Sequence, residues 1–261
     1  MKDKSPIIQE WENLYSAAVE FKKLKPWEWM WDDDIFGVKN PETGETGFCC
    51  VMGGGGEHFA LGLYQGSEGL EGLSRIRSGE ILPDDPEALF VQKCLMASFE
   101  NREFIEDDDY QILRKLGLRF RGKNAWPLFR SYQPGYVPWY VTNEEARFLT
   151  LALEQAIQVC RRYYENPDVL KPPMMTHLLV RVLNDDTWQD EWLEPWDLEE
   201  KEVMVGAVKE EDLEEILKLP HKGVLETDSY LYPEPVQEET DQRPYYPQTI
   251  LWADHESGLI L

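Results

Sequence analysis

The fold is decided by residues 35–52, which read IFGVKNPETGETGFCCVM. Two apolar runs, IFGV and FCCVM, stand on either side of the turn-forming sequence NPETG. Asn, Pro and Gly adopt the backbone angles of tight turns, and apolar runs around such a turn are typical of paired strands. Residues 35–52 therefore predict an antiparallel β-hairpin. A third strand is expected at 59–64, after the four glycines at 53–56.

Helical patterns lie on both sides of these strands. Apolar residues recur at three- and four-residue spacing from Ser5 to Leu24, and Pro26 ends that pattern. A second long helix is expected from Thr142 to Tyr164, because Thr142 and Glu145 form a capping box. Shorter helices are expected at 69–80, 86–92, 107–116 and 211–218, and further strands at 94–99, 177–183, 203–208, 224–232 and 250–253.

These elements predict an α+β protein of two domains, with mixed helices and a mainly antiparallel sheet. We expect an N-terminal α+β domain at 1–140 and a second α+β domain at 141–261. Residues 187–200 are interpreted as an acidic bridge, and 233–244 as a connector rich in proline and acidic residues. The chain ends on apolar residues after the turn sequence HESG. We therefore expect either a C-terminal strand tucked into a sheet or a second domain truncated from a longer protein.

Charge and composition exclude several classes of protein. The net charge of −24, from 50 Asp and Glu against 26 Lys and Arg, repels phosphates and disfavours direct nucleic-acid binding. No apolar run is long enough for a membrane helix and no signal sequence is present, so we expect a cytoplasmic protein without a membrane partner. The four cysteines lack CxxC spacing, and the acidic clusters lack a calcium-loop pattern. We predict no disulfide framework, no metal site and no cofactor.

Sequence motifs for catalysis are weak. The glycines at 53–56 lead into Glu57, His58 and another strand, whereas a phosphate-binding loop needs Gly-Lys-Ser/Thr at the start of a helix. A flexible hairpin connection is the favoured interpretation of these glycines. The four histidines are dispersed, and the serine-hydrolase motif Gly-x-Ser-x-Gly is missing. Glu57 and His58 remain the only candidates for acid or base chemistry.

Residues 114–139, which we call the basic aromatic segment, reverse the charge of the chain. From Tyr110 to Asn143 there is no Asp or Glu, while Lys and Arg side chains alternate with aromatic ones. Such a pattern binds anionic groups or stacks on planar ones. The candidate binding residues are Arg119, Arg121, Lys123, Trp126, Arg130, Tyr136 and Trp139. The alternative is a seam between the two domains, where the aromatics are packed and the arginines pair with carboxylates; this structural interpretation is favoured.

Two sets of short motifs carry a resemblance to a known family. They are WEWMWD (27–32), IFGV (35–38), PETG (41–44) and LGLYQG (61–66), followed by GKNAWP (122–127) and PGYVPW (134–139). Together they resemble a family of uncharacterised bacterial proteins with two domains, both of unknown function. The resemblance implies that further copies of the second domain follow in the intact protein. It carries over no catalytic residue.

Three functional hypotheses follow. The leading one is a non-enzymatic binding or scaffold module that uses the basic aromatic segment to contact a protein partner or an anionic small molecule. The second is an enzyme acting on a nucleotide or another anionic small molecule, which requires Glu57 or His58 and the basic aromatic segment to converge on one pocket. The third is an acidic DNA mimic, which requires carboxylates spaced like phosphates on one face.

Overall fold

The computed structural model describes residues 5–82, 85, 87–194, 218, 223–232 and 234–260. The strand expected at 203–208 lies outside the described residues, as does the helix expected at 211–218 apart from Lys218. The predicted fold class is confirmed, because helices pack on a mostly antiparallel sheet in an α+β arrangement.

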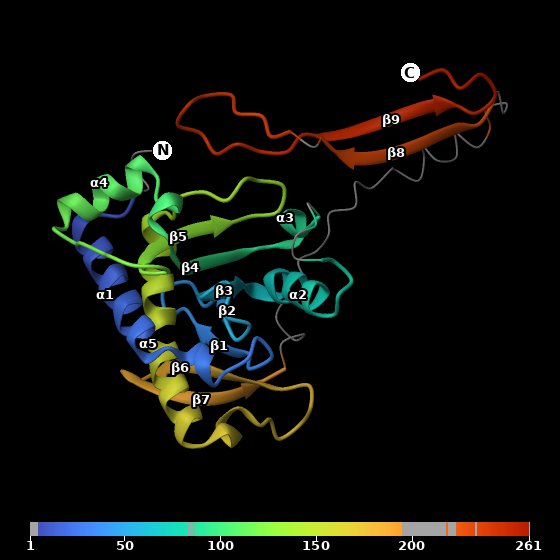
Figure 1. Ribbon diagram of the computed structural model, residues 1–261. Coiled ribbons are helices and arrows are strands. Elements are labelled where there is room, and N and C mark those ends of the chain that lie inside the picture. Colours follow the sequence, from blue (N-terminus) through green and yellow to red (C-terminus); the bar gives the residue numbers. More distant parts are fainter. Residues whose placement is uncertain are drawn as a thin grey trace.

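A seven-stranded sheet forms the centre of the protein (Figure 1). Its strands, in chain order, are β1 (Phe36–Lys39), β2 (Thr46–Met52), β3 (Ala60–Gln65), β4 (Cys94–Glu100), β5 (Trp126–Tyr132), β6 (Leu178–Asn184) and β7 (Thr187–Leu193). Their spatial order is β5-β4-β3-β2-β1-β6-β7, and only β1 and β6 run parallel. The hairpin predicted at 35–52 is confirmed as β1 and β2, with Phe36 opposite Cys49.

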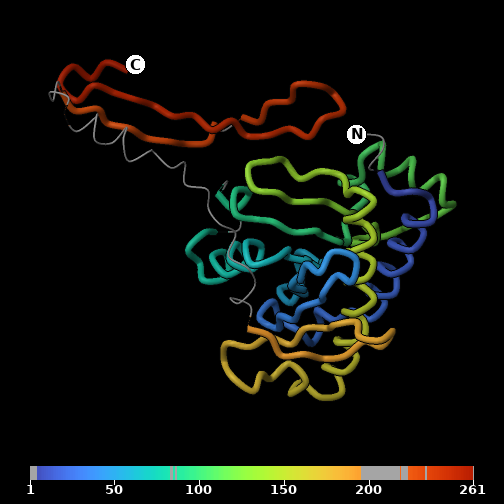
Figure 2. The backbone as a smooth tube through the Cα atoms, turned by 180° about the vertical axis from the view of Figure 1, so that it is seen from behind, coloured from blue at the N-terminus to red at the C-terminus, as the bar shows by residue number. Residues whose placement is uncertain are grey.

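Two long helices, α1 (Ile8–Leu24) and α5 (Asn143–Glu165), lie side by side on one face of the sheet (Figures 1 and 2). Both helices were predicted, α1 from its apolar spacing and α5 from the Thr142 capping box, and α1 begins three residues later than the pattern suggested. Leu14 and Phe21 of α1 and Leu149 of α5 are fully buried in the main hydrophobic core. Burial of each side chain of this size contributes about 1.5–3 kcal/mol. Because the core cluster on this face is the larger of the two, this face carries most of the apolar stabilisation.

The opposite face of the sheet is covered by less protein. α2 (Gly66–Arg77) packs on β2 and β3, and α3 (Ala88–Val91) is a single turn beside it (Figure 1). The smaller core cluster under these helices includes Phe48, Tyr64 and Met96. In the part of the chain that the structure describes, this face carries a cavity lined by Met96 of β4 and Tyr132 of β5.

The remaining described helices are short. α4 (Asp107–Lys115) leads into the basic aromatic segment, and 3₁₀ turns occupy Pro26–Glu28, Arg102–Phe104 and Pro167–Leu170. At the C-terminal side, β8 (Leu225–Leu231) and β9 (Gln248–Asp254) form a separate antiparallel hairpin that projects from the body (Figures 1 and 2). A bridge between Ala253 and Ile260 matches the expected turn after β9.

Two strands of the sheet were not predicted, and one interpretation was wrong. β5 lies in the basic aromatic segment, where Pro127 and Arg130 obscure the strand pattern. Residues 187–193 are strand β7, not a bridge, because they pair along their whole length with β6. The boundary expected after residue 140 falls inside this sheet and its main core, since β6 pairs with β1 and α5 packs on α1.

Candidate functional site

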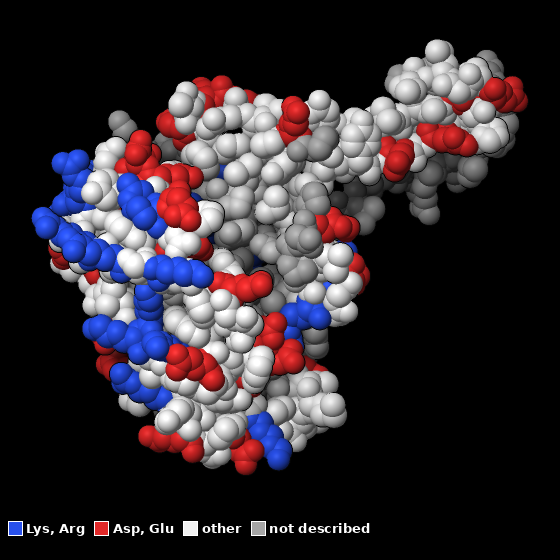
Figure 3. All heavy atoms as spheres, viewed as in Figure 1, with Lys and Arg blue, Asp and Glu red and all other residues white. Residues whose placement is uncertain are grey.

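The first half of the basic aromatic segment is an exposed cationic surface. We define the basic face as Arg114, Lys115, Arg119, Arg121 and Lys123, all of which are exposed. None of these five side chains forms an ion pair with another residue that the structure describes. Figure 3 shows Lys and Arg side chains gathered on the side of the molecule formed by α4 and α1. In a chain with 50 carboxylates, unpaired cations gathered on one surface are unexpected.

The loop that carries the basic face is held in place by its uncharged residues. The Phe120 ring stacks on Tyr15 of α1, with ring centroids 6.4 Å apart, and meets Trp126 edge-on at 6.1 Å. The Asn124 amide donates a hydrogen bond of 2.9 Å to Asn101 Oδ1. The loop is therefore anchored at both ends while its charged side chains face outward.

Arg130 has a different environment from the basic face. Its side chain is only 11% exposed, and it forms a two-pronged ion pair with Asp109 of α4. Its guanidinium also lies 4.6 Å from the ring centroid of Tyr140. Burial, followed by the hydrogen bond that Tyr140 donates to Glu106, raises the pKa of Tyr140 well above its usual range. Arg130 thus ties β5 to α4, because both of its terminal nitrogens are bound to Asp109.

The last part of the segment contacts the C-terminal part of the chain. Trp139 pairs through its backbone with Ser131, and Tyr136 pairs with Tyr245. Arg243 binds two backbone carbonyls of the segment. Its Nε donates to the Val137 carbonyl at 2.8 Å, and its Nη2 donates to the Ser131 carbonyl. Burial lowers the pKa of Arg243. We call these contacts the seam, because they join this half of the basic aromatic segment to the C-terminal part of the chain.

The glycines at 53–56 join β2 to β3, as a hairpin connection would. Glu57 is exposed, and the His58 Nδ1 lies 3.7 Å from Glu100 Oε1. His58 borders a large cavity on the second face of the sheet, but none of the seven candidate binding residues lines that cavity. The enzyme hypothesis required one pocket shared by His58 or Glu57 and the basic aromatic segment, and this cavity does not bring them together.

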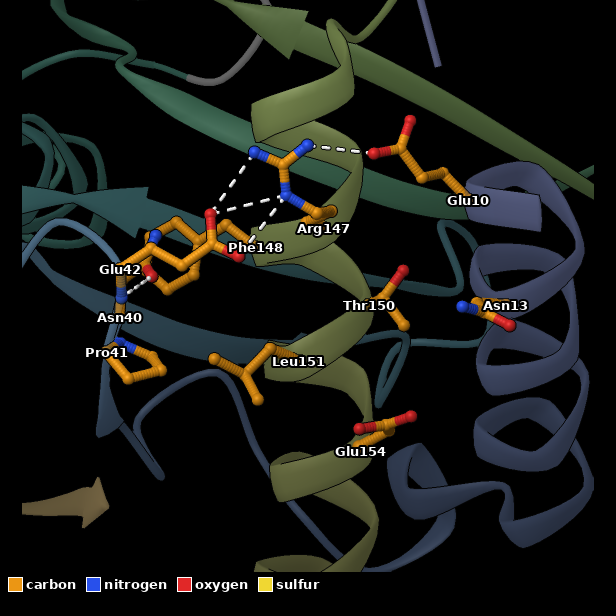
Figure 4. A pocket seen from close by; sticks show the side chains of 10 residues that line it. All are labelled: Glu10, Asn13, Asn40, Pro41, Glu42, Arg147, Phe148, Thr150, Leu151 and Glu154. Atoms are coloured by element: carbon orange, nitrogen blue, oxygen red, sulfur yellow. Dashed lines mark hydrogen bonds and ion pairs between the residues drawn. The ribbon is translucent and has the colours of Figure 1, made fainter. Parts of the chain in front are cut away.

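A smaller hollow of about 290 Å³ lies between α1, α5 and the β1–β2 turn (Figure 4). Arg147 Nη1 lies 2.8 Å from Glu10 Oε1, and Arg147 Nη2 lies 3.2 Å from Glu42 Oε2. Glu154 lies at the other end of the hollow, away from Arg147 (Figure 4). Because the guanidinium already bridges two carboxylates, this hollow is a junction between elements and offers no free cation to an anionic ligand.

The sequence of residues 11–181 matches the family model described as Domain of unknown function (DUF7309). This match spans more than half of the 261 residues. The chain belongs to the DUF7309 family. Residues 212–261 match a second family model, Domain of unknown function (DUF6930). No curated protein and no solved structure matches the chain.

The seam contacts involve residues from both family matches. It includes β1 to β5, α5 and the start of β6, and it extends past residue 140. Tyr136 and Ser131 lie within it, whereas Arg243 and Tyr245 lie within the DUF6930 match. The hydrogen bonds of Arg243 therefore join the two family regions. Sequence reasoning identified the segment but missed Asp109 and Arg243, because no local pattern links them to their partners.

Other site chemistry is limited among the described residues. No group of three or more His, Cys, Asp or Glu side chains gathers there to hold a metal ion, and no described helix is long and apolar enough to cross a membrane. All four cysteines are buried and free. Burial, with the nearby Asp32 carboxylate, raises the pKa of Cys50 to about 12, which suppresses its thiolate.

Proposed function

We propose that the chain is a non-enzymatic binding module that holds an acidic segment of a partner protein on its basic face. The observation that carries the proposal is the set of five exposed cations without an ion pair in the described part of the chain. Arg130 is not part of this binding surface, because Asp109 and Tyr140 occupy it.

Part of the charge has a structural explanation. Arg114 and Lys115 lie in the last turn of α4, where cations are stabilised by the negative end of the helix dipole. Arg119, Arg121 and Lys123 follow the helix and have no such explanation. They are the residues on which the proposal depends.

The shape of the surface favours a macromolecular partner. Neither of the two hollows described above is lined by a residue of the basic face. A surface without an enclosing cavity gains affinity from several charge contacts along a partner. The net charge of −24 repels a long polyanion, so a short acidic protein segment fits better than a nucleic acid.

A charge-removal experiment tests this function. We would titrate a fluorescein-labelled oligoglutamate peptide, followed by fluorescence anisotropy, into the wild type and into a variant with Arg119, Arg121 and Lys123 changed to Ala. We expect the variant to bind at least about ten-fold more weakly, and the wild-type affinity to fall as salt is raised. A control with Lys39, Arg161 and Lys171 changed to Ala has the same net charge, and these residues are also exposed.

Equal loss of binding in the control would show a non-specific charge effect and would overturn the proposal. Undiminished binding by the Arg119, Arg121 and Lys123 variant would also overturn it. A short oligonucleotide serves as the comparison probe. If it bound more tightly than the peptide and depended on the same three residues, the partner would be a nucleic acid.

A further inference from the structure

A second site, separate from the basic face, lies on the less covered face of the sheet. A cavity of about 840 Å³ opens between that face and helices α2 and α3. Its volume falls within the range of about 300–1,000 Å³ that is usual for small-molecule sites. Nothing in the basic face contributes to it, so its function is independent of the proposed function.

The floor of the cavity is made of aromatic and sulfur-containing side chains. Met52 of β2, Tyr64 of β3, Met96 of β4 and Tyr132 of β5 all line it. Methionine is flexible and makes favourable contacts with aromatic rings, and tyrosine presents an apolar ring face. Such a floor suits a ligand with a planar aromatic body.

One wall of the cavity comes from the C-terminal part of the chain. Tyr246 and Leu231 line it, and the Tyr246 ring meets Phe90 of α3 edge-on at 5.4 Å. The Tyr246 amide donates a 2.8 Å hydrogen bond to the Gly135 carbonyl, which fixes this wall against the seam. Ligand sites occur preferentially where two domains meet, and this cavity is lined by both family regions.

The charges at the cavity favour a cationic ligand over an anionic one. Asp32 and Asp85 are acidic residues that line it, and both are exposed. Arg77 also lines it, but its guanidinium is paired with Asp33. The carboxylates of Asp32 and Asp85 are therefore not offset by a free arginine. Aromatic ring faces add attraction for a cation through their quadrupoles.

We propose that this cavity binds a small organic molecule with a planar aromatic body and a cationic amine. The aromatic body lies over Met52, Met96 and the tyrosine rings. The amine lies near Asp32 and Asp85. Because Tyr246 belongs to the DUF6930 region and Met96 to the DUF7309 region, one ligand contacts both.

Three probes that share one ring system distinguish the effect of ligand shape on binding from the effect of ligand charge. Tryptamine carries an indole ring and a cationic amine, indole-3-acetate carries the same ring and an anionic carboxylate, and 3-methylindole is neutral. Each is titrated into the whole chain with ¹³C-labelled methionine methyl groups, and the methyl signals are followed by NMR. The Met52→Leu and Met96→Leu variants assign the two signals at the cavity floor.

We expect tryptamine to shift the Met52 and Met96 signals saturably and to bind at least about five-fold more tightly than indole-3-acetate. Changing Asp32 and Asp85 together to Asn should remove that preference and leave 3-methylindole binding unchanged. Asp186→Asn, at an exposed turn outside the cavity, is the control. The basic-face variant should bind tryptamine like the wild type.

Two results would overturn the inference. Unchanged Met52 and Met96 signals with all three probes at millimolar concentration would show that the cavity does not accept an aromatic body. Equal or tighter binding of indole-3-acetate would show that the assigned charge preference is wrong. A Met96→Trp variant, which fills the cavity from its floor, should abolish the shifts of the Met52 signal while its melting temperature confirms that it is folded.

Discussion

Arg130 Nη2 lies 2.7 Å from Asp109 Oδ2, and Arg130 Nη1 lies 3.0 Å from Asp109 Oδ1. Both side chains are largely buried, with 11% and 8% of their surface exposed. This pairing separates Arg130 from Arg119 and Arg121, which stand near it in the sequence but face solvent. The charge reversal seen in the sequence therefore consists of two parts with different roles.

Loss of Arg130 should affect stability and not partner binding. Removing one member of a buried ion pair leaves the other charge uncompensated, so Arg130→Ala should lower the free energy of unfolding by about 3–5 kcal/mol. Urea denaturation measures the change. Arg121→Ala, at an exposed site, should stay within about 0.5 kcal/mol of the wild type. Combining Arg130→Met with Asp109→Leu should recover only part of the loss, because Glu106 Oε2, 3.4 Å from Arg130 Nη2, also loses its partner. A double variant no more stable than Arg130→Ala would argue against the buried pair as the source of the loss.

Arg243 should control how firmly the C-terminal part is held. Arg243→Ala removes the hydrogen bonds to the Val137 and Ser131 carbonyls. The amides of Val137 and Tyr246, which bond across the seam, should then exchange with solvent faster, by about ten-fold for a loss of 1–2 kcal/mol. Hydrogen exchange measures this. Amides in the centre of α5 serve as the control, and equal acceleration there would indicate global destabilisation instead.

Gly72 should be intolerant of substitution although it lies within helix α2. A Cβ at this position would lie 2.0 Å from the carbonyl oxygen of Val91, and a backbone atom cannot turn aside. Gly72→Ala should therefore separate α2 from α3 and cost about 1–3 kcal/mol, despite the better helix propensity of alanine. Thermal unfolding measures this. Glu71→Ala, an exposed neighbour, is the control and should be close to neutral.

The protein should lose stability at alkaline pH. Burial raises the pKa of Tyr132 to about 12, whereas an unfolded tyrosine has a pKa of about 10. The folded state therefore keeps a proton that the unfolded state releases. The contribution of Tyr132 is fully present below pH 10 and is lost as pH rises to about 12. Between pH 10 and 12, the unfolding free energy of Tyr132→Phe should fall by about 3 kcal/mol less than that of the wild type, and an equal fall would contradict the assignment.

Much of the local structure could be predicted from the residues. The hairpin at 35–52, helix α1 and helix α5 follow from apolar spacing, turn residues and caps that act within a few positions. The Thr142 cap is confirmed, since the Glu145 amide donates to Thr142 Oγ1 and the Thr142 amide donates to Glu145 Oε2. Strand β5 was missed because Pro127 and Arg130 interrupt its apolar residues, which gave the segment the pattern of a loop.

The sequence by itself determined the α+β class, the long helices, the first three strands and the position of the charge reversal. These depend on residues close together in the chain, where spacing and capping act directly. Only the tertiary structure decided that β6 pairs with β1, that Asp109 neutralises Arg130, and that Tyr246 and Met96 border one cavity. Each of these contacts joins residues far apart in the chain, and such pairings are selected by the packing of the whole core, which no local pattern records.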